Sequence, residues 1–383
     1  MTRARMRPSP LVLLTLLGIS NHVVLTGARV AMSLDALALG ASAATVGVLM
    51  ALFALLPAFL AIAAGRSADR IGARGPMLIG SCGIASAALL PVIVPHLATL
   101  FVAAALMGVS FMAYQVCAQY ATGEMGGPDG RAHSFGVLAI GYSISSILGP
   151  LVTGFMIDLA GFRAAFALLA LAPLLPIAIL GSDRLPLPGP HPAHASHADR
   201  NALDLMANRE LRRVFLINTL TAGAWELHTL FVPLYGHSVG LTASEIGAIL
   251  ASFATATFVV RLAMPLYVRR LTEHQILSAT LIIAGLVYLA IPFSRSTGML
   301  MMLSFCLGLG LGAGQPMVMS LLHSHAPPGR MGEAAGVRMS LVNSMAVAVP
   351  LVFGAIGGTV GLAPVLWSVG VCLTTGGFLT RRA

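Results

Sequence analysis

Residues Gly65–Arg74 have the sequence GRSADRIGAR, a short charged segment between two long apolar runs. The runs cover residues 44–64 and 76–95, and each matches the roughly 20 apolar residues that a helix needs to cross a bilayer. A segment with this many charges does not itself lie in hydrocarbon. The stretch therefore predicts a loop that joins two membrane-spanning helices.

The composition of the whole chain extends this prediction. Of the 383 residues, 57% are apolar and only 9% are charged, and the mean hydropathy is +0.90. Soluble domains are about one quarter charged, so most of this chain's surface must face lipid. Apolar runs bounded by charges, Pro and Gly predict about twelve helices in two sets of six. They lie near residues 11–33, 44–64, 76–95, 97–121, 133–157 and 163–182, and near 212–237, 243–265, 275–293, 297–323, 334–358 and 362–380.

The formal charge of +9 reflects where the arginines lie, because all 22 basic residues are Arg. They gather before the first run, after the second, in the central segment, after the eighth and at the C-terminus. The alternate loops hold chiefly Arg163 and Arg295. This positive-inside pattern predicts a multi-pass protein of the cytoplasmic (inner) membrane, with both termini and the central segment in the cytoplasm. The basic excess is a topology signal and not the mark of a nucleic-acid partner.

The N-terminal segment and the four cysteines are both interpreted as parts of the helical structure. Arginines before Leu11–Leu17 imitate a secretory signal, but its removal would leave an odd number of spans and invert the other Arg-rich loops. We therefore predict a retained first helix. Cys82, Cys117, Cys306 and Cys372 lie singly in apolar runs, without metal or disulfide spacing, and are expected to be packing residues.

One long polar stretch divides the chain. It predicts an N-terminal six-helix bundle at 1–182, a flexible cytoplasmic linker at 183–211 and a C-terminal six-helix bundle at 212–383. Three linker histidines lie among Pro and Ala residues, so we expect solvated chain and no metal site there. They are His191, His194 and His197.

The two sets of helices repeat one another at a constant offset of 200 residues (240 − 40, for example). The matches include Gly, Pro and polar residues, which coincide by chance less often than Ala or Leu in such a chain. They include Gly40 with Gly240, Gly47 with Gly247, Gly108 with Gly308, Gln115 with Gln315, and Pro150 and Gly154 with Pro350 and Gly354. The sequence therefore predicts an all-α integral membrane fold of twelve helices as two parallel six-helix repeats, a design whose substrate site lies between the repeats.

The Gly65–Arg74 loop matches G-x-x-x-D-R-x-G-x-R, the loop signature of the major facilitator superfamily, and the chain resembles that family over nearly its whole length. The resemblance implies a charge clasp between helices that controls conformational exchange, with an acidic cap and a tight glycine turn. Its residues are Gly65, Asp69, Arg70, Gly72 and Arg74.

A second motif lies in the fifth predicted helix, where Gly149, Pro150 and Gly154 resemble the antiporter signature of the family's drug/proton exporters. A proline in a membrane helix bends its axis, and glycine lets a neighbouring helix approach closely. The sequence departs from those exporters at Ala104, where they usually carry Arg. The resemblance implies export of a drug or metabolite in exchange for protons.

Ionisable residues inside a span cost at least ~2.5 kcal/mol each and so indicate function. Of the 13 acidic residues, Glu226 alone falls near the middle of a predicted span. It is interpreted as a proton carrier, with a structural ion pair as the alternative. Beside it, Trp225 and His228 are either site residues or packed core residues.

The first predicted helix places His22, Thr26 and Arg29 on one face, at spacing i, i+4 and i+7. For Arg29 three interpretations stay open: binding an anionic substrate, neutralising Glu226, or reaching outward to the interface. Gln115 and Gln119 form another face, with helix–helix hydrogen bonding as the alternative.

The candidate site therefore contains two overlapping sets. We predict proton coupling by Glu226, His22 and His228. We predict substrate binding by Asn21, His22, Thr26, Arg29, Gln115, Gln119, Tyr142, Trp225, Glu226, Gln315 and Asn343. Arg338, near the end of a span, is equally compatible with a charged gate and with an interface anchor.

We found no nucleotide-binding loop and no hydrolase motif, so we expect a monomeric transporter without cofactor or enzymatic activity. The expected function is proton-coupled secondary transport of a small organic molecule by alternating access, with export favoured. The alternative is proton-coupled uptake of a small organic anion, and the remote alternative is a transport-inactive membrane sensor.

Overall fold

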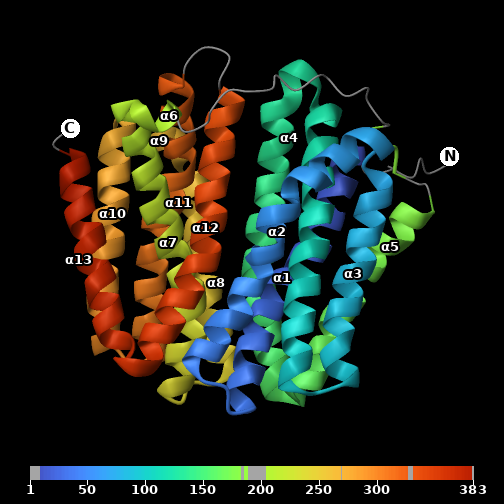
Figure 1. The fold of residues 1–383 in the computed structure, drawn as a ribbon, viewed down its shortest axis with the longest axis horizontal. Coiled ribbons are helices and arrows are strands. Elements are labelled where there is room, and N and C mark those ends of the chain that lie inside the picture. Colours follow the sequence, from blue (N-terminus) through green and yellow to red (C-terminus); the bar gives the residue numbers. More distant parts are fainter. Residues whose placement is uncertain (1–8, 183–184, 189–203, 269, 327–330, 382–383) are drawn as a thin grey trace, which may run out of the picture.

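The computed structural model describes residues 9–182, 185–188, 204–268, 270–326 and 331–381, and every regular element within these ranges is helical (Figure 1). The first half contains α1 (Pro10–Ala38), α2 (Ala43–Ile71), α3 (Arg74–Ile93), α4 (Leu97–Leu171) and α5 (Leu174–Gly181). The second half contains α6 (Asp204–Ala207), α7 (Arg209–Ser238), α8 (Ala243–Leu262), α9 (Met264–Tyr267), α10 (Glu273–Ala290), η1 (Ile291–Phe293), α11 (Thr297–His325), α12 (Met331–Thr359) and α13 (Leu362–Arg381).

The helix boundaries differ from the sequence prediction most clearly in α4. Loops were predicted at 122–132 and 158–162, but helical backbone continues through both, and the break falls at Pro173. The chain nevertheless doubles back within α4, because Gly27 of α1 contacts both Thr153 and Leu169. Gly161 has φ of +81°, a conformation that glycine adopts without steric cost, and it lies between these two contact points.

The start of the charged loop was also predicted wrongly, because α2 continues as a helix to Ile71. The turn is confined to Gly72, with φ of +81°, and Ala73. No proline interrupts Gly65–Ile71, so nothing in that stretch forces the helix to end earlier.

Twelve membrane crossings account for the described helices, as predicted. Ten segments are long and apolar enough to span a bilayer, and one of them, His133–Gly181, has 49 residues and contains the Gly161 reversal, so it crosses twice. The remaining crossing is α7, whose 30 residues suffice in length but whose polar side chains, Glu226 among them, lower its hydropathy.

The internal repeat appears as matched helix contacts. Gly47 of α2 lies against the Pro350 carbonyl of α12, and Gly247 of α8 lies against the Pro150 carbonyl of α4. A Cβ at either glycine would collide with that carbonyl, so each pair of helices crosses at backbone contact. These two crossings, related by the offset of 200 residues, join the first half of the chain to the second.

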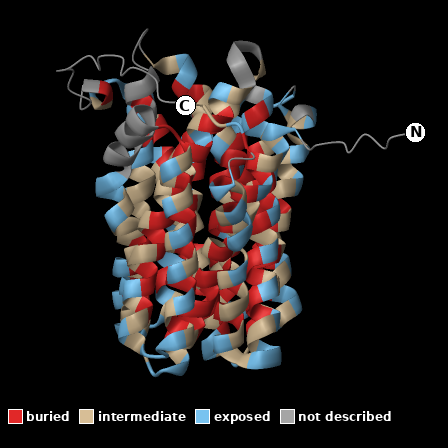
Figure 2. Cartoon of the chain, turned by 90° about the vertical axis from the view of Figure 1, so that its right-hand side faces the viewer, coloured by how far each residue is buried: buried red, intermediate tan, exposed pale blue. Residues whose placement is uncertain are grey.

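The outer faces of the helices are exposed and apolar, and the buried residues face inward (Figure 2). Phe59, Leu159 and Phe293 are 76%, 85% and 79% exposed. Exposing large apolar side chains to water is unfavourable, whereas contact with hydrocarbon is favourable. This surface is therefore the lipid-facing surface of the protein.

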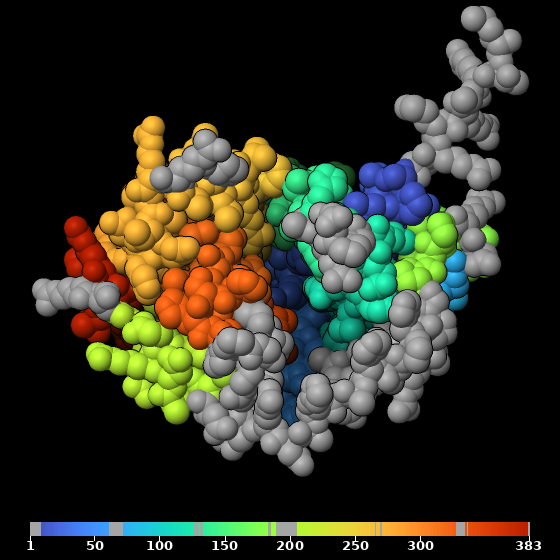
Figure 3. All heavy atoms as spheres, turned by 90° about the horizontal axis from the view of Figure 1, so that it is seen from above, coloured from blue at the N-terminus to red at the C-terminus, as the bar shows by residue number. Residues whose placement is uncertain are grey.

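Two ends of the molecule differ in how closely the halves approach. We call the end with the start of α1 and the end of α13 the terminal end, and the opposite one the closed end. At the closed end, the Asp158 carboxylate of α4 accepts hydrogen bonds from the backbone N–H groups of Ala243 (3.0 Å) and Ser244 (2.7 Å) at the start of α8. Seen from the terminal end, the surface is hollowed between α4 and the later helices, with α1 at the bottom of the hollow (Figure 3).

Candidate functional site

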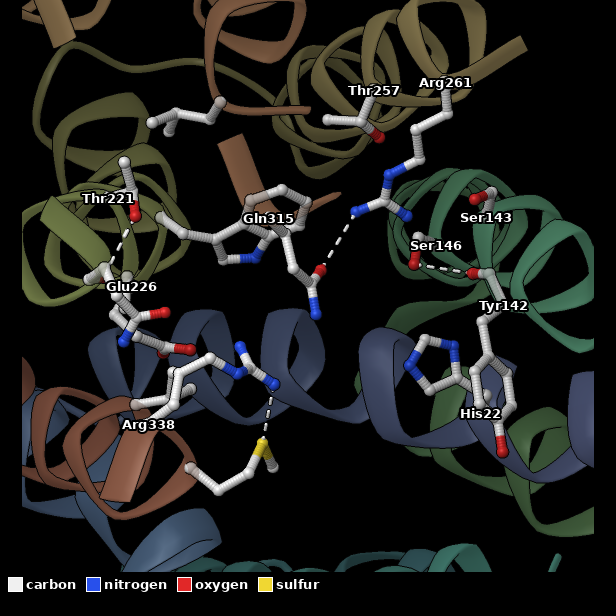
Figure 4. Close-up of a pocket in the computed structure, with 16 residues that line it drawn as sticks. His22, Tyr142, Ser143, Ser146, Thr221, Glu226, Thr257, Arg261, Gln315 and Arg338 are labelled. Atoms are coloured by element: carbon white, nitrogen blue, oxygen red, sulfur yellow. Dashed lines mark hydrogen bonds between the residues drawn. The ribbon is translucent and has the colours of Figure 1, made fainter. Parts of the chain in front are cut away.

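A central cavity of about 320 Å³ lies between the two halves. It combines aromatic, amide, hydroxyl and charged side chains with a few apolar ones (Figure 4). Its lining residues are His22, Tyr142, Ser143, Ser146, Asn218, Thr221, Ala222, Trp225, Glu226, Thr257, Arg261, Leu311, Gln315, Arg338, Met339 and Val342.

An ion pair joins the halves beside this cavity. The Arg29 guanidinium of α1 donates to the Glu226 carboxylate of α7, with Nη2 and Oε2 2.8 Å apart. Both side chains are largely but not fully covered, with 20% and 14% of their surfaces exposed. Of the three interpretations of Arg29, the geometry corresponds to neutralisation of Glu226.

His22 occupies the other side of the cavity, in contact with α4. Its Nδ1 lies 2.6 Å from the Ser145 hydroxyl, and its ring lies 4.8 Å from that of Tyr142, centroid to centroid. The Tyr142 hydroxyl is buried and has no hydrogen-bond partner among the described residues. His22 and Glu226 thus both line the cavity, one from each half.

Trp225 and His228 of α7 separate into different environments. Trp225 lines the cavity, and its ring centroid lies 4.7 Å from that of Phe253 in an edge-to-face arrangement. His228 does not line the cavity. The His228 ring is fully buried, stacks on Phe253 at 4.3 Å, and has Nε2 3.0 Å from the Ser304 hydroxyl. These contacts are those of a packed core histidine, and they leave Nδ1 without a partner among the described residues.

Two further guanidinium groups line the cavity. Arg261 of α8 donates from Nη2 to the Gln315 side-chain oxygen and from Nε to the Gly312 carbonyl, both at 3.4 Å. Arg338 of α12 is 8% exposed, and its Nη2 lies 3.1 Å from the Met339 sulfur. Its Nε has no partner among the described residues.

The remaining predicted substrate residues lie outside this cavity. Asn21 is buried and donates to the Ser81 hydroxyl of α3 at 2.9 Å. The Thr26 hydroxyl bonds to backbone carbonyls, including that of Ser145 across the α1–α4 interface at 3.2 Å. Both contacts join helices. Gln115, Gln119 and Asn343 are also absent from the lining, although Gln315, the repeat partner of Gln115, is part of it.

The conformational motifs lie at opposite ends of the molecule. The Arg74 guanidinium donates to the carbonyls of Leu180, at 2.9 Å, and Leu185 beyond the end of α5. Gly65, Asp69 and Arg70 lie in the helical backbone of α2, and the side chains of Asp69 and Arg70 are not described; the linker histidines lie outside the described residues. Gly149 packs against Thr26 of α1, and Gly154 packs against Ala243 and Ser244 of α8 near the closed end.

Sequence reasoning missed several lining residues, of which Arg261 matters most. It lies near the end of a predicted span, where a positive-inside arginine is expected, so its position carried no separate signal. Asn218, Thr221, Ser143, Ser146 and Thr257 are single polar residues of types common in membrane helices. In the described residues no group of three His, Cys, Asp or Glu side chains could hold a metal ion.

With the fold and this cavity in view, comparison with known proteins identifies the family. The sequence profile described as Major Facilitator Superfamily matches residues 14–350. The chain belongs to this superfamily. As a member of this superfamily it is a membrane transport protein that carries small molecules and not an enzyme.

The proteins that this chain resembles include an efflux pump, a peptide transporter and a nucleoside transporter. A multi-drug resistance efflux pump PmrA homolog of Lactococcus lactis subsp. lactis (strain IL1403) is 25% identical over 246 residues, which cover 60% of this chain and 58% of that protein. The match thus spans less than two thirds of the relative's length. A crystal structure of a peptide transporter POT in complex with sulfate superposes with a TM-score of 0.81 at 16% identity, covering 100% of this chain and 95% of that one. The nucleoside transporter NupG superposes with a TM-score of 0.78 at 14% identity, covering 98% and 99%. These two likenesses concern the fold.

Proposed function

We propose that this protein is a proton-coupled secondary transporter that moves a small organic molecule by alternating access. The observation that carries the proposal is the Arg29–Glu226 ion pair, because it connects the two halves at the wall of the central cavity. Transporters built from two repeats expose a central site to each side in turn as one half rocks against the other. A titratable link between the halves ties such a movement to proton binding.

The coupling step follows from the chemistry of the pair. With Glu226 ionised, its charge and that of Arg29 cancel across the interface between α1 and α7. Proton uptake by Glu226 neutralises the carboxylate and leaves Arg29 without its counter-charge. A buried cation without a partner is costly, so protonation weakens the link and favours rearrangement of the halves. Release of the proton on the other side of the membrane resets the link.

Export is the proposed direction. It is supported by the likeness of Gly149–Gly154 to the antiporter signature and by the distant efflux-pump relative. The proposed cargo is a metabolite or drug that fits about 320 Å³. Uptake remains the second candidate, because the arginines of the cavity suit an organic anion in either direction.

We also propose an orientation for the two ends. The terminal end carries arginines at the starts of α3 and α7 and at the end of α13, whereas Arg163 and Arg295 lie toward the closed end. By the positive-inside rule the terminal end faces the cytoplasm. We propose that the protein lies in the inner membrane as a monomer, with residues 1–182 and 212–383 as its two moving bundles.

The test compares two transport modes of the Glu226→Gln variant in proteoliposomes. A thermal-shift screen of metabolites and drugs first finds compounds that bind, and a flux assay in proteoliposomes selects one that is transported. Gln keeps the shape and hydrogen-bonding capacity of Glu but removes its titratable charge. We expect Glu226→Gln to lose accumulation driven by a pH gradient, at least tenfold, and to retain exchange of labelled for unlabelled compound, which moves no net proton. Glu245→Gln, at the closed end, is the control and should retain both modes. Full gradient-driven accumulation by Glu226→Gln would overturn the proposal.

A further inference from the structure

We propose that the central cavity selects organic anions, with two negative charges matched by Arg261 and Arg338. The inference rests on the proposed function in one respect, namely that the cavity is the transport site. It concerns the charge of the cargo, which neither the family nor the Arg29–Glu226 link determines.

The charged side chains of the cavity do not balance one another. Arg29 and Glu226 neutralise one another, as their 2.8 Å contact shows. Neither Arg261 nor Arg338 pairs with a carboxylate among the described residues, and no other lining residue is acidic. The cavity therefore presents two uncompensated positive charges.

Arg338 lies in an environment that leaves its hydrogen-bond donors poorly satisfied. Its side chain is more than nine-tenths buried, its Nε has no partner among the described residues, and its Nη2 contacts a thioether sulfur, which is a weak acceptor. A guanidinium has five N–H donors that match the oxygens of a carboxylate or phosphate. An interface anchor would extend its charge toward water, so burial beside the cavity argues against the anchor interpretation. These donors are suited to an anion that enters from the cavity.

Arg261 supplies the second positive charge of the cavity. Its bonds to Gln315 and to the Gly312 carbonyl are both 3.4 Å long, near the limit for hydrogen bonds, so an anion can replace them at little cost. Figure 4 shows the guanidinium groups of Arg261 and Arg338 directed into the cavity from different helices, with the Gln315 amide between them. A molecule with an anionic group near each end fits this arrangement.

The repeat argues against a purely topological origin for these charges. The positions offset by 200 residues from Arg261 and Arg338 are Ala61 and Leu138, both apolar. Charges that only fixed orientation would be expected in the same loops of both halves. Here the second half alone carries them, inside or at the end of its helices and at the cavity wall. The remaining wall, with Trp225 and Tyr142, suits the organic body of the ligand.

The experiment measures binding through Trp225 fluorescence in lipid nanodiscs. The chain has two tryptophans, so Trp367→Phe leaves Trp225 as the single reporter. The probes are dicarboxylates from malonate to adipate, with the diamide and the diamine of each length. We expect at least one dicarboxylate to quench Trp225 saturably, with its diamide and diamine binding at least tenfold more weakly. Equal or stronger binding of the uncharged or cationic series, or no binding by any dicarboxylate, would overturn the inference.

Substitutions then test the two arginines. Arg261→Gln and Arg338→Gln should each weaken dicarboxylate binding tenfold or more, because each removes a charge-assisted contact. Arg295→Gln, which removes an exposed arginine away from the cavity, should leave binding unchanged. Arg338→Gln should also melt at an equal or higher temperature, since a buried unpaired cation is lost. A structural arginine would give the opposite pair of results, with reduced stability and unchanged affinity in the folded fraction. Arg338→Lys, which keeps the charge, should recover part of the affinity.

The two proposals fail in distinguishable ways. If the selected cargo is neutral or cationic and Arg261→Gln transports it normally under a pH gradient, the anion inference fails and the proposed function stands. If dicarboxylates bind as expected but no pH gradient drives their movement, the proposed function fails.

Discussion

At the scale of single residues, the hydroxyl group of Tyr142 is a buried donor at the cavity wall without a partner among the described residues. Such a group costs about 1–3 kcal/mol relative to a satisfied one. We therefore expect Tyr142→Phe to melt at the same or a higher temperature than the parent. Tyr235→Phe is the matched control, because the Tyr235 hydroxyl donates to the Ser294 carbonyl at 2.8 Å, and its loss should lower the melting temperature. Equal destabilisation of both variants would show that the Tyr142 hydroxyl has a partner after all.

The same scale shows how far sequence alone reaches into the site. Glu226 was identifiable because an acid in mid-span is expensive and rare, and it indeed lines the cavity. Arg261 was not identifiable, because an arginine near the end of a span can either mark the cytoplasmic side or line the cavity. Only the direction of its side chain in the structure separates these two roles. Asn21 and Thr26 share a helix face with site residues, but their side chains bond across to other helices. The pattern of a helix face predicts where a residue points and not which neighbour it meets.

At the scale of elements, the start of α8 is held by two carboxylates that differ in what they connect. Asp158 reaches it from α4 in the other half, whereas Glu245 caps it from within α8 and also accepts from the Thr297 hydroxyl of the same half. Carboxylates at a helix N-terminus each contribute roughly 0.5–2 kcal/mol. Loss of Asp158 therefore weakens closure of the closed end, whereas loss of Glu245 weakens only the local cap.

This difference gives a prediction for Asp158→Ala. We expect a reporter cysteine at the cavity residue Ser146 to react faster with a membrane-impermeant thiol reagent added from the closed end. A loss of about 1 kcal/mol corresponds to roughly a fivefold faster reaction. Glu245→Gln, tested in the same background, should leave the rate from that end unchanged. An unchanged rate in Asp158→Ala would mean that the inter-half contact does not hold the closed end.

The sequence was sufficient to predict that each membrane-spanning helix exists, but not to predict the residues at which the helices end. Composition and length locate the apolar spans, but the terminations at Pro173 and Gly72 depend on where hydrogen bonding stops, and the Gly65–Ile71 backbone is helical although it is polar. Residues Gly47 and Gly247 were recognised as a repeat pair, but their role is visible only in the structure, where each lies against a proline carbonyl of the opposite half.

At the scale of the whole molecule, the account is that the two halves move against one another around the cavity. The described structure is hollowed at the terminal end and joined at the other by the α2–α12 and α4–α8 crossings. Since protein interiors and interfaces favour discrete arrangements, the alternative state must close the terminal end while it opens the closed end. The Arg29–Glu226 pair lies between these two ends.

The most direct test of this account is the distance between spin labels on the two halves at both ends. One pair, Gly75→Cys with Ser324→Cys, reports the terminal end. The other, Val94→Cys with Phe293→Cys, reports the closed end, and all four positions are exposed. The four native cysteines are replaced first. On acidification, or on addition of the transported compound, the account predicts that the population with a shorter terminal-end distance grows together with the population with a longer closed-end distance. Distances that stay fixed at both ends, or that change in the same sense, would contradict it.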